Sequence, residues 1–198
     1  MLTTTGRNQL LDATDVTFLS LHSDYPALTQ ANELAGGSPA YARKSATWAA
    51  AAAGSKATSN AQVFDVPAAT TVRWIGYSTT STAGSGRALA PNGAAPKEFI
   101  VDATADKIKL PAHGYANTQK IVFYGGTPPG GLTAGVIYFV VGSATDDFQV
   151  AATSGGTAID LTSQAASDCV VSVIVEEVFG AQGTMTLAIG ATTLALNN

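Results

Sequence analysis

The sequence of 198 residues contains a single cysteine and only two histidines. One cysteine, Cys169, excludes an intrachain disulfide and a cysteine-rich metal site, and its setting, SDCVVSVIV, predicts a buried, inert thiol. The histidines, His22 and His113, lie far apart in the sequence, and no spacing of acidic residues completes a metal site around either one. We therefore expect no metal, no cofactor and no catalytic residue.

Charged side chains are also scarce, at 12% of the residues, with a net charge of −4. No basic cluster exceeds the pair Arg43-Lys44, so nucleic-acid binding is not expected. The longest strongly apolar run, VIYFVV, is too short to span a bilayer. The first residues, MLTTTGRNQLLDATDVTF, show no basic start followed by an apolar stretch, so we expect synthesis in a cytoplasm and no membrane insertion.

Small residues are correspondingly abundant in the sequence. Alanine, glycine, threonine and serine number 36, 20, 25 and 14, which together is nearly half of the chain. A surface with few long charged side chains loses less entropy when it is buried against a neighbour. The composition therefore favours packed assembly.

The first part of the chain predicts one short helix followed by strands. A helix is expected at residues 6–14, with Leu10 and Leu11 facing inward. Both faces of VTFLSLHS carry apolar residues, which is typical of a central strand. The five alanines 49–53 favour a helix by propensity, but the alternation before them and the Gly54-Ser55 pair after them favour a strand and a hairpin. The strands expected here are residues 16–23, 42–49, 62–66 and 72–78.

From residue 98 to about 173, six short apolar runs are each followed by a turn signal, which predicts a small all-β module. The segment GTMTLAIGATTLALNN then predicts two strands hinged at Gly190, with Leu194 and Leu196 in alternation. No helical crossover is present, so a parallel α/β sheet is excluded. The predicted fold is all-β: an antiparallel β-sandwich with a short N-terminal helix, interrupted by a small inserted β-barrel-like module.

Two stretches carry a resemblance to known families. The pattern of SLHS, NELAGGSPAYAR, a Trp-bearing strand, VFDVPA, GYSTTSTAG and the closing GTMTLAIGATTLAL resembles bacteriophage virion proteins of the minor tail or tail-fibre-like kind. The stretch KIKLPAHGYANTQKIVFYGG, with GLTAGVIYFV and FQVAATSGGTAIDLT, is similar to a module inserted in phage tail and other virion proteins. The resemblance implies a virion domain of residues 1–95 plus 174–198 and an inserted module of residues 96–173.

Candidate chemistry along the chain is sparse. His113 lies in PAHG between two strands, which favours a structural turn over catalysis. The acid pairs Asp146-Asp147 and Glu176-Glu177 each point to opposite faces of an extended chain, so a hydrolase is only a third hypothesis.

Four residues are candidates for an interface or a ligand contact: Arg73, Trp74, Tyr115 and Tyr124. Trp and Arg are over-represented among interface hot spots, which favours Arg73 and Trp74 as anchors. Tyr115 and Tyr124, with Phe123, would contact a sugar if they were exposed.

The resemblance and the composition together predict a non-enzymatic structural component of a phage virion: a minor tail, fibre-like or capsid decoration protein. Its partners would be other virion proteins, and it would form a homo-oligomer or occur in many copies. It would be made in the host bacterial cytoplasm and reside in the virion. The alternative is a carbohydrate-binding adhesin that contacts a glycan of the host envelope.

Overall fold

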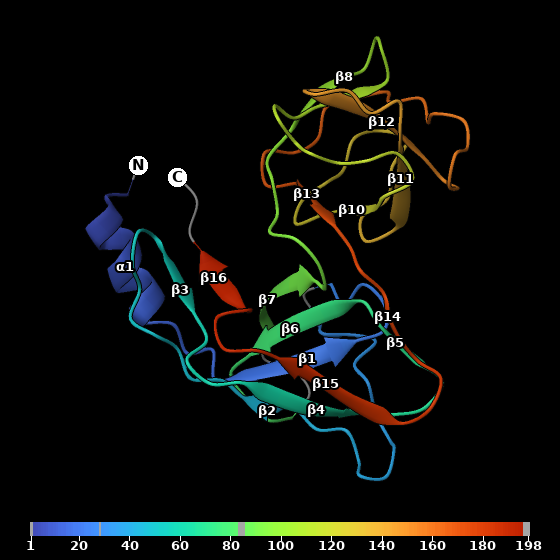
Figure 1. Ribbon diagram of the computed structural model, residues 1–198. Coiled ribbons are helices and arrows are strands. Elements are labelled where there is room, and N and C mark those ends of the chain that lie inside the picture. Colours follow the sequence, from blue (N-terminus) through green and yellow to red (C-terminus); the bar gives the residue numbers. More distant parts are fainter. Residues whose placement is uncertain (1, 28, 83–85, 196–198) are drawn as a thin grey trace. The chain divides into compact units, whose positions relative to one another are not determined.

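The computed structural model of the protein describes residues 2–27, 29–82 and 86–195. Within these ranges it contains one short helix, and the strands pair antiparallel in several sheets (Figure 1). The predicted all-β class is confirmed. No helix in the described ranges has the length and apolarity needed to cross a membrane.

The chain forms two compact units, Met1–Leu89 with Glu177–Asn198, and Ala90–Glu176. We call them the discontinuous unit and the central unit. The prediction that they are two domains, one inserted into the other, stays a proposal.

The helix of the discontinuous unit, α1 (Thr4–Asp12), begins two residues before its predicted start. Its contacts with the rest of the unit come from one face. The side chains of Asn8 and Asp12 accept hydrogen bonds from backbone N–H groups of the turn at residues 51–54, each at 2.8 Å. Leu11 shares this face and is buried, whereas Leu10 points away and is 54% exposed. The predicted inward position of Leu10 is therefore wrong.

A four-stranded sheet, in the order β2-β1-β6-β7, forms the centre of the discontinuous unit. Its members are β1 (Phe18–His22), β2 (Lys44–Ser45), β6 (Trp74–Ser78) and β7 (Gly86–Pro91). The predicted central strand at residues 16–23 is confirmed, since β1 pairs with β2 on one side and β6 on the other. The predicted strand at residues 42–49 is shorter: β2 is followed only by a single bridge from Trp48 to Thr58.

The remaining strands of this unit form three two-stranded antiparallel sheets, which follow one another along the same two chain segments and which we together call the ribbon. The first side runs through β3 (Ser55–Ala57), β4 (Gln62–Val66) and β5 (Thr70–Val72), and the second through β14 (Glu177–Phe179), β15 (Gly183–Leu187) and β16 (Thr193–Ala195). Pairing keeps one register from Val72 opposite Glu177 to Gln62 opposite Leu187, and it shifts by one residue before β3 and β16. Segments that flank the central unit in sequence thus pair with each other. Leu196, part of the predicted last strand, lies outside the described residues.

The predicted strand at residues 72–78 is divided in two at Arg73. Val72 ends β5, which pairs with β14, and Trp74 begins β6, which pairs with β1. The N–H of Arg73 donates to the carbonyl of His22, and its guanidinium Nη1 donates to the carbonyl of Ser23 at 2.7 Å. These bonds turn the chain from one pair of strands to the next.

The central unit contains one six-stranded sheet in the order β13-β10-β11-β12-β9-β8. Its strands are β8 (Ile100–Asp102), β9 (Lys107–Lys109), β10 (Lys120–Tyr124), β11 (Ile137–Val141), β12 (Asp147–Ala151) and β13 (Val170–Val173). Its outermost strands, β8 and β13, do not pair with each other. The described residues of the predicted barrel-like module thus form an open sheet, and no closed barrel.

A core of apolar side chains covers this sheet, with Phe123, Phe148 and Leu161 fully buried. Cys169 lies at the same core, and burial raises the pKa of its thiol to about 11, as expected for an inert cysteine. At the two ends of the unit, the side-chain amide of Asn92 donates to the carbonyl of Val175 at 3.2 Å. The two ends of the central unit therefore lie side by side.

Candidate functional site

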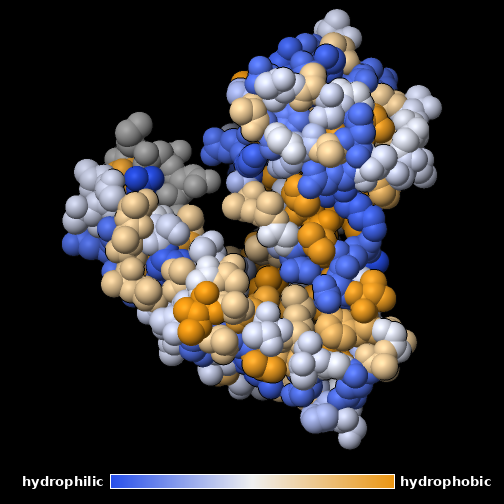
Figure 2. Space-filling model, viewed as in Figure 1, coloured by the Kyte–Doolittle hydropathy of each residue, from blue (hydrophilic) through white to orange (hydrophobic). Residues whose placement is uncertain are grey.

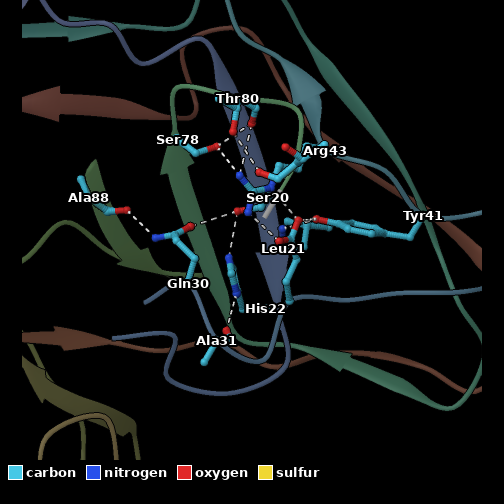
Figure 3. Close-up of polar contacts among 12 residues, drawn as sticks. Ser20, Leu21, His22, Gln30, Ala31, Tyr41, Arg43, Ser78, Thr80 and Ala88 are labelled. Carbon is cyan, nitrogen blue, oxygen red and sulfur yellow. Dashed lines mark hydrogen bonds and ion pairs between the residues drawn. The ribbon is translucent and has the colours of Figure 1, made fainter. Parts of the chain in front are cut away.

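A cluster of buried polar side chains lies on one face of β1 and β6, beneath the loop that joins β1 to β2. Ser20 and His22 alternate along β1, and both are 0% exposed. Gln30 contacts Ser20 from the loop, and Arg43 donates to Ser78 of β6 beside them (Figure 3). The sequence gives one signal of this cluster: Ser20 and His22 alternate in a strand that has apolar residues on both faces.

His22 and Ser20 form a hydrogen-bonded pair of the types used in nucleophilic catalysis. The Nδ1 of His22 donates to the carbonyl of Ala31 at 2.7 Å, which leaves Nε2 as an acceptor 2.8 Å from the hydroxyl of Ser20. A nucleophile and a base in this geometry resemble two members of a hydrolytic triad. Both side chains, however, are sealed from solvent. The pair has no route to a substrate in this conformation, and its bonds hold the loop to the sheet.

Burial also sets the charge of His22. Desolvation lowers the pKa of the imidazole below its usual value and outweighs the opposite effect of its bond to Ala31. The charged groups nearest to it, Glu33 and Arg43, act in opposite directions on this pKa. His22 is therefore neutral at pH 7.

A partly buried ion pair completes the cluster. The guanidinium of Arg43 donates to both carboxylate oxygens of Glu33, at 2.8 and 2.7 Å, and to the hydroxyl of Ser78 at 2.9 Å. The bond to Glu33 raises the pKa of Arg43, and burial raises that of Tyr41, whose hydroxyl accepts the N–H of Leu21 at 2.7 Å. A bidentate pair with these further bonds satisfies most of the polar atoms it buries.

The cluster leaves no room for a side chain at Gly76 of β6. A Cβ there would lie 2.3 Å from Oε1 of Gln30, 2.4 Å from Oγ of Ser20 and 2.5 Å from Nε2 of His22. The glycine thus lets three polar groups meet above the sheet. The hydrogen bonds of this cluster hold the loop against the sheet, so its polar side chains have a structural role.

His113 of the central unit is also structural, in agreement with the turn expected from PAHG. It is buried against Phe148, with 4.9 Å between the ring centres. Its Nδ1 accepts the N–H of Tyr115 at 2.9 Å, and Nε2 lies 3.3 Å from the carbonyl of Asp147. The imidazole thus closes its own turn and links it to β12.

The four candidate contact residues do not come together. Trp74, Tyr115 and Tyr124 are buried, and Arg73 is half-buried at the corner between β5 and β6. Phe123 is buried as well, so the aromatic residues named for a sugar contact lie in the core. In this conformation they support the fold, and a partner contact at any of the four stays a prediction. The described residues contain no cluster of three His, Cys, Asp or Glu side chains suited to a metal ion.

These features define an all-β protein whose buried polar side chains hold its own loops and strands in place. Over residues 1–123 the chain matches the family described as podophage GP4 fiber I protein gp80. Because the match spans more than half of the 198 residues, the chain belongs to this family. The resemblance to phage fibre-like virion proteins is confirmed, and a structural fibre family implies a non-enzymatic role. Searches of curated proteins and of solved structures gave no match.

Proposed function

We propose that this chain is a structural component of a phage virion and acts by assembly with other virion proteins through its β-sheet surfaces. The observation that carries the proposal is the match to the fibre family, which spans the helix, the four-stranded sheet and the first side of the ribbon and continues into the central unit through β8, β9 and most of β10. The chain would be made in the host cytoplasm and incorporated into the particle in several copies. Whether it belongs to a minor tail, a fibre or a capsid decoration is part of what the experiment resolves.

The chemistry of the described residues supports an architectural role. The nucleophile–base pair Ser20–His22 is closed to solvent, and the bidentate pair Arg43–Glu33 is used within the fold. The alternative function, a carbohydrate-binding adhesin, would need the aromatic residues Tyr115, Phe123 and Tyr124 at the surface, and all three are buried. In this conformation these three side chains are therefore not available to contact a glycan.

The test uses particles purified from an infected host. Mass spectrometry should find the chain at a fixed number of copies per particle, and electron microscopy of the particles should show density that fits both units. Particles made without the chain should lack that density, and supplying the wild-type chain in trans should restore it. Absence of the chain from purified particles would contradict the proposal.

A further inference from the structure

The second side of the ribbon has an open edge at β15. One edge of this strand pairs with β4 along its whole length. Within the described ranges, no hydrogen bond joins the other edge of β15 to any segment. An open strand edge presents unpaired N–H and C=O groups, which can pair with another strand.

Several other strand edges in the described ranges are covered or interrupted. In the central unit, the side-chain amide of Gln164 accepts the N–H of Val101 at 3.2 Å and donates to its carbonyl at 2.6 Å, so it occupies the outer edge of β8. Backbone bonds in both directions between Lys97 and Val171 cover the outer edge of β13. In the discontinuous unit, residues 47–52 pair with β3, and β7 ends in a proline.

The open edge of β15 is neither covered by another described segment nor interrupted by proline or charge. Its sequence, GTMTL, contains no proline, no lysine and no charge, and it runs for five residues. Thr184 and Thr186 stand exposed on its outer face, opposite Asp65 and the exposed Val63 of β4. Much of the surface where β15 lies is tan, white or orange rather than deep blue (Figures 1 and 2). Natural edge strands that avoid pairing usually carry charge or proline, so this edge is suited to pairing.

The charge distribution favours a second copy of this chain as the partner. The discontinuous unit contains six Lys or Arg and six Asp or Glu, whereas the central unit contains four and eight, so the central unit carries the whole net charge of −4. Two discontinuous units can therefore approach without net repulsion. An antiparallel edge is also complementary to itself about a two-fold axis. Pairing centred on Met185 would put Thr184 of one copy opposite Thr186 of the other, a favourable cross-strand pair.

We propose that the open edge of β15 is a self-association surface, on which the same strand of a second copy adds antiparallel and joins two ribbons into one sheet. This inference rests on the proposed function, since it names one contact through which the chain assembles. A five-residue edge forms few hydrogen bonds, so the isolated pair is weak and depends on high local concentration or on several copies.

The test compares the full chain with a double variant, Thr184→Lys/Thr186→Lys, by analytical ultracentrifugation over a range of concentrations. The added lysines put like charges opposite each other in the paired edge, so the dissociation constant should rise by about tenfold or more. The matched control is Thr153→Lys/Thr157→Lys, which makes the same charge change at two exposed positions of the central unit. It should associate as the wild type does, and both variants should keep the wild-type Tm.

Hydrogen exchange locates the contact. As the concentration of the wild type rises, those amides of residues 183–187 that point to the open edge should become protected, while the amide of Val101 in β8 should not change. A wild type that stays monomeric at every concentration, or an edge variant that associates like the wild type, overturns the inference. Either result leaves the proposed function intact if particles still contain the chain, whereas absence from particles refutes the proposed function whatever this edge does.

Discussion

At the scale of single residues, buried polar groups divide into those with partners and those without. The hydroxyl of Tyr115 is buried and has no hydrogen-bond partner, whereas that of Tyr138, in the same core, accepts the N–H of Thr133 at 2.8 Å. A buried polar group without a partner costs free energy that its removal recovers. The two tyrosines are thus a matched pair in one hydrophobic core.

Changing Tyr115 to Phe should therefore leave the free energy of unfolding unchanged or raise it by up to about 1 kcal/mol. Changing Tyr138 to Phe removes an acceptor and should lower it by about 1 kcal/mol. Urea denaturation of the two variants beside the wild type measures both effects. A larger loss for Tyr115→Phe than for Tyr138→Phe would show that the phenol of Tyr115 has a partner.

His22 makes the stability of the protein depend on pH. Its pKa in the folded state is lowered, so the unfolded chain binds the proton more tightly than the folded chain does. The contribution is fully present above the ordinary histidine pKa of about 6.5, and it is lost as the pH falls from there toward the folded-state pKa. The free energy of unfolding should accordingly fall between pH 7 and pH 5.

The variant His22→Gln isolates this effect, because it removes one ionisable side chain and retains all the others. It should be less stable than the wild type at pH 7, since the bonds to Ser20 and Ala31 change. The difference in stability between the two proteins should shrink as the pH is lowered to 5, as thermal denaturation can measure. A constant difference would mean that His22 does not titrate in this range.

At the scale of elements, local pattern predicted the strands that carry clear alternation, such as β4 and most of β1. It failed where long-range contacts decide. The alanines 49–53 form no helix, because residues 47–52 pair with β3 around a turn in which Ala53 and Gly54 have positive φ. The break at Arg73 and the pairing of β4 with β15 depend on contacts with strands distant in sequence.

The candidate site could not be predicted from the sequence, for a related reason. Alternation places Ser20 and His22 on one face of β1, but it does not show that the loop of residues 24–43 covers that face. The partners Gln30 and Arg43 come from a loop without periodicity, so nothing in the pattern connects them to β1. The four residues singled out instead were chosen for their chemical type, and three of them are buried.

Turns with alanine at positive φ are sites where the fold can be improved. Ala69, between β4 and β5, has φ of 55°, whereas its exposed neighbour Ala68 does not have positive φ. Glycine adopts this conformation without the steric cost of a Cβ. Ala69→Gly should therefore raise the free energy of unfolding by up to about 1 kcal/mol, and Ala68→Gly should lower it slightly. Equal effects of the two changes on the urea midpoint would contradict this account.

At the scale of the whole molecule, the two ends of the central unit meet at Asn92 and Val175. A unit whose ends lie together can be removed or inserted without opening its host. We predict that residues 90–176 fold alone, and that the chain with a short Gly/Ser linker in their place keeps the ribbon. Circular dichroism and cooperative unfolding of both pieces test this. A linker-joined chain that does not fold would mean that the central unit is required by the other.

The ribbon joins strands that are synthesised far apart in time. The strand that completes β4 leaves the ribosome only after the central unit has been translated, which at about 5–20 residues per second takes roughly 4–17 s. During that interval Phe64 and Val66, fully buried in the finished protein, have no β15 beside them. The central unit can fold during that interval, whereas β4 and β15 can pair only after it.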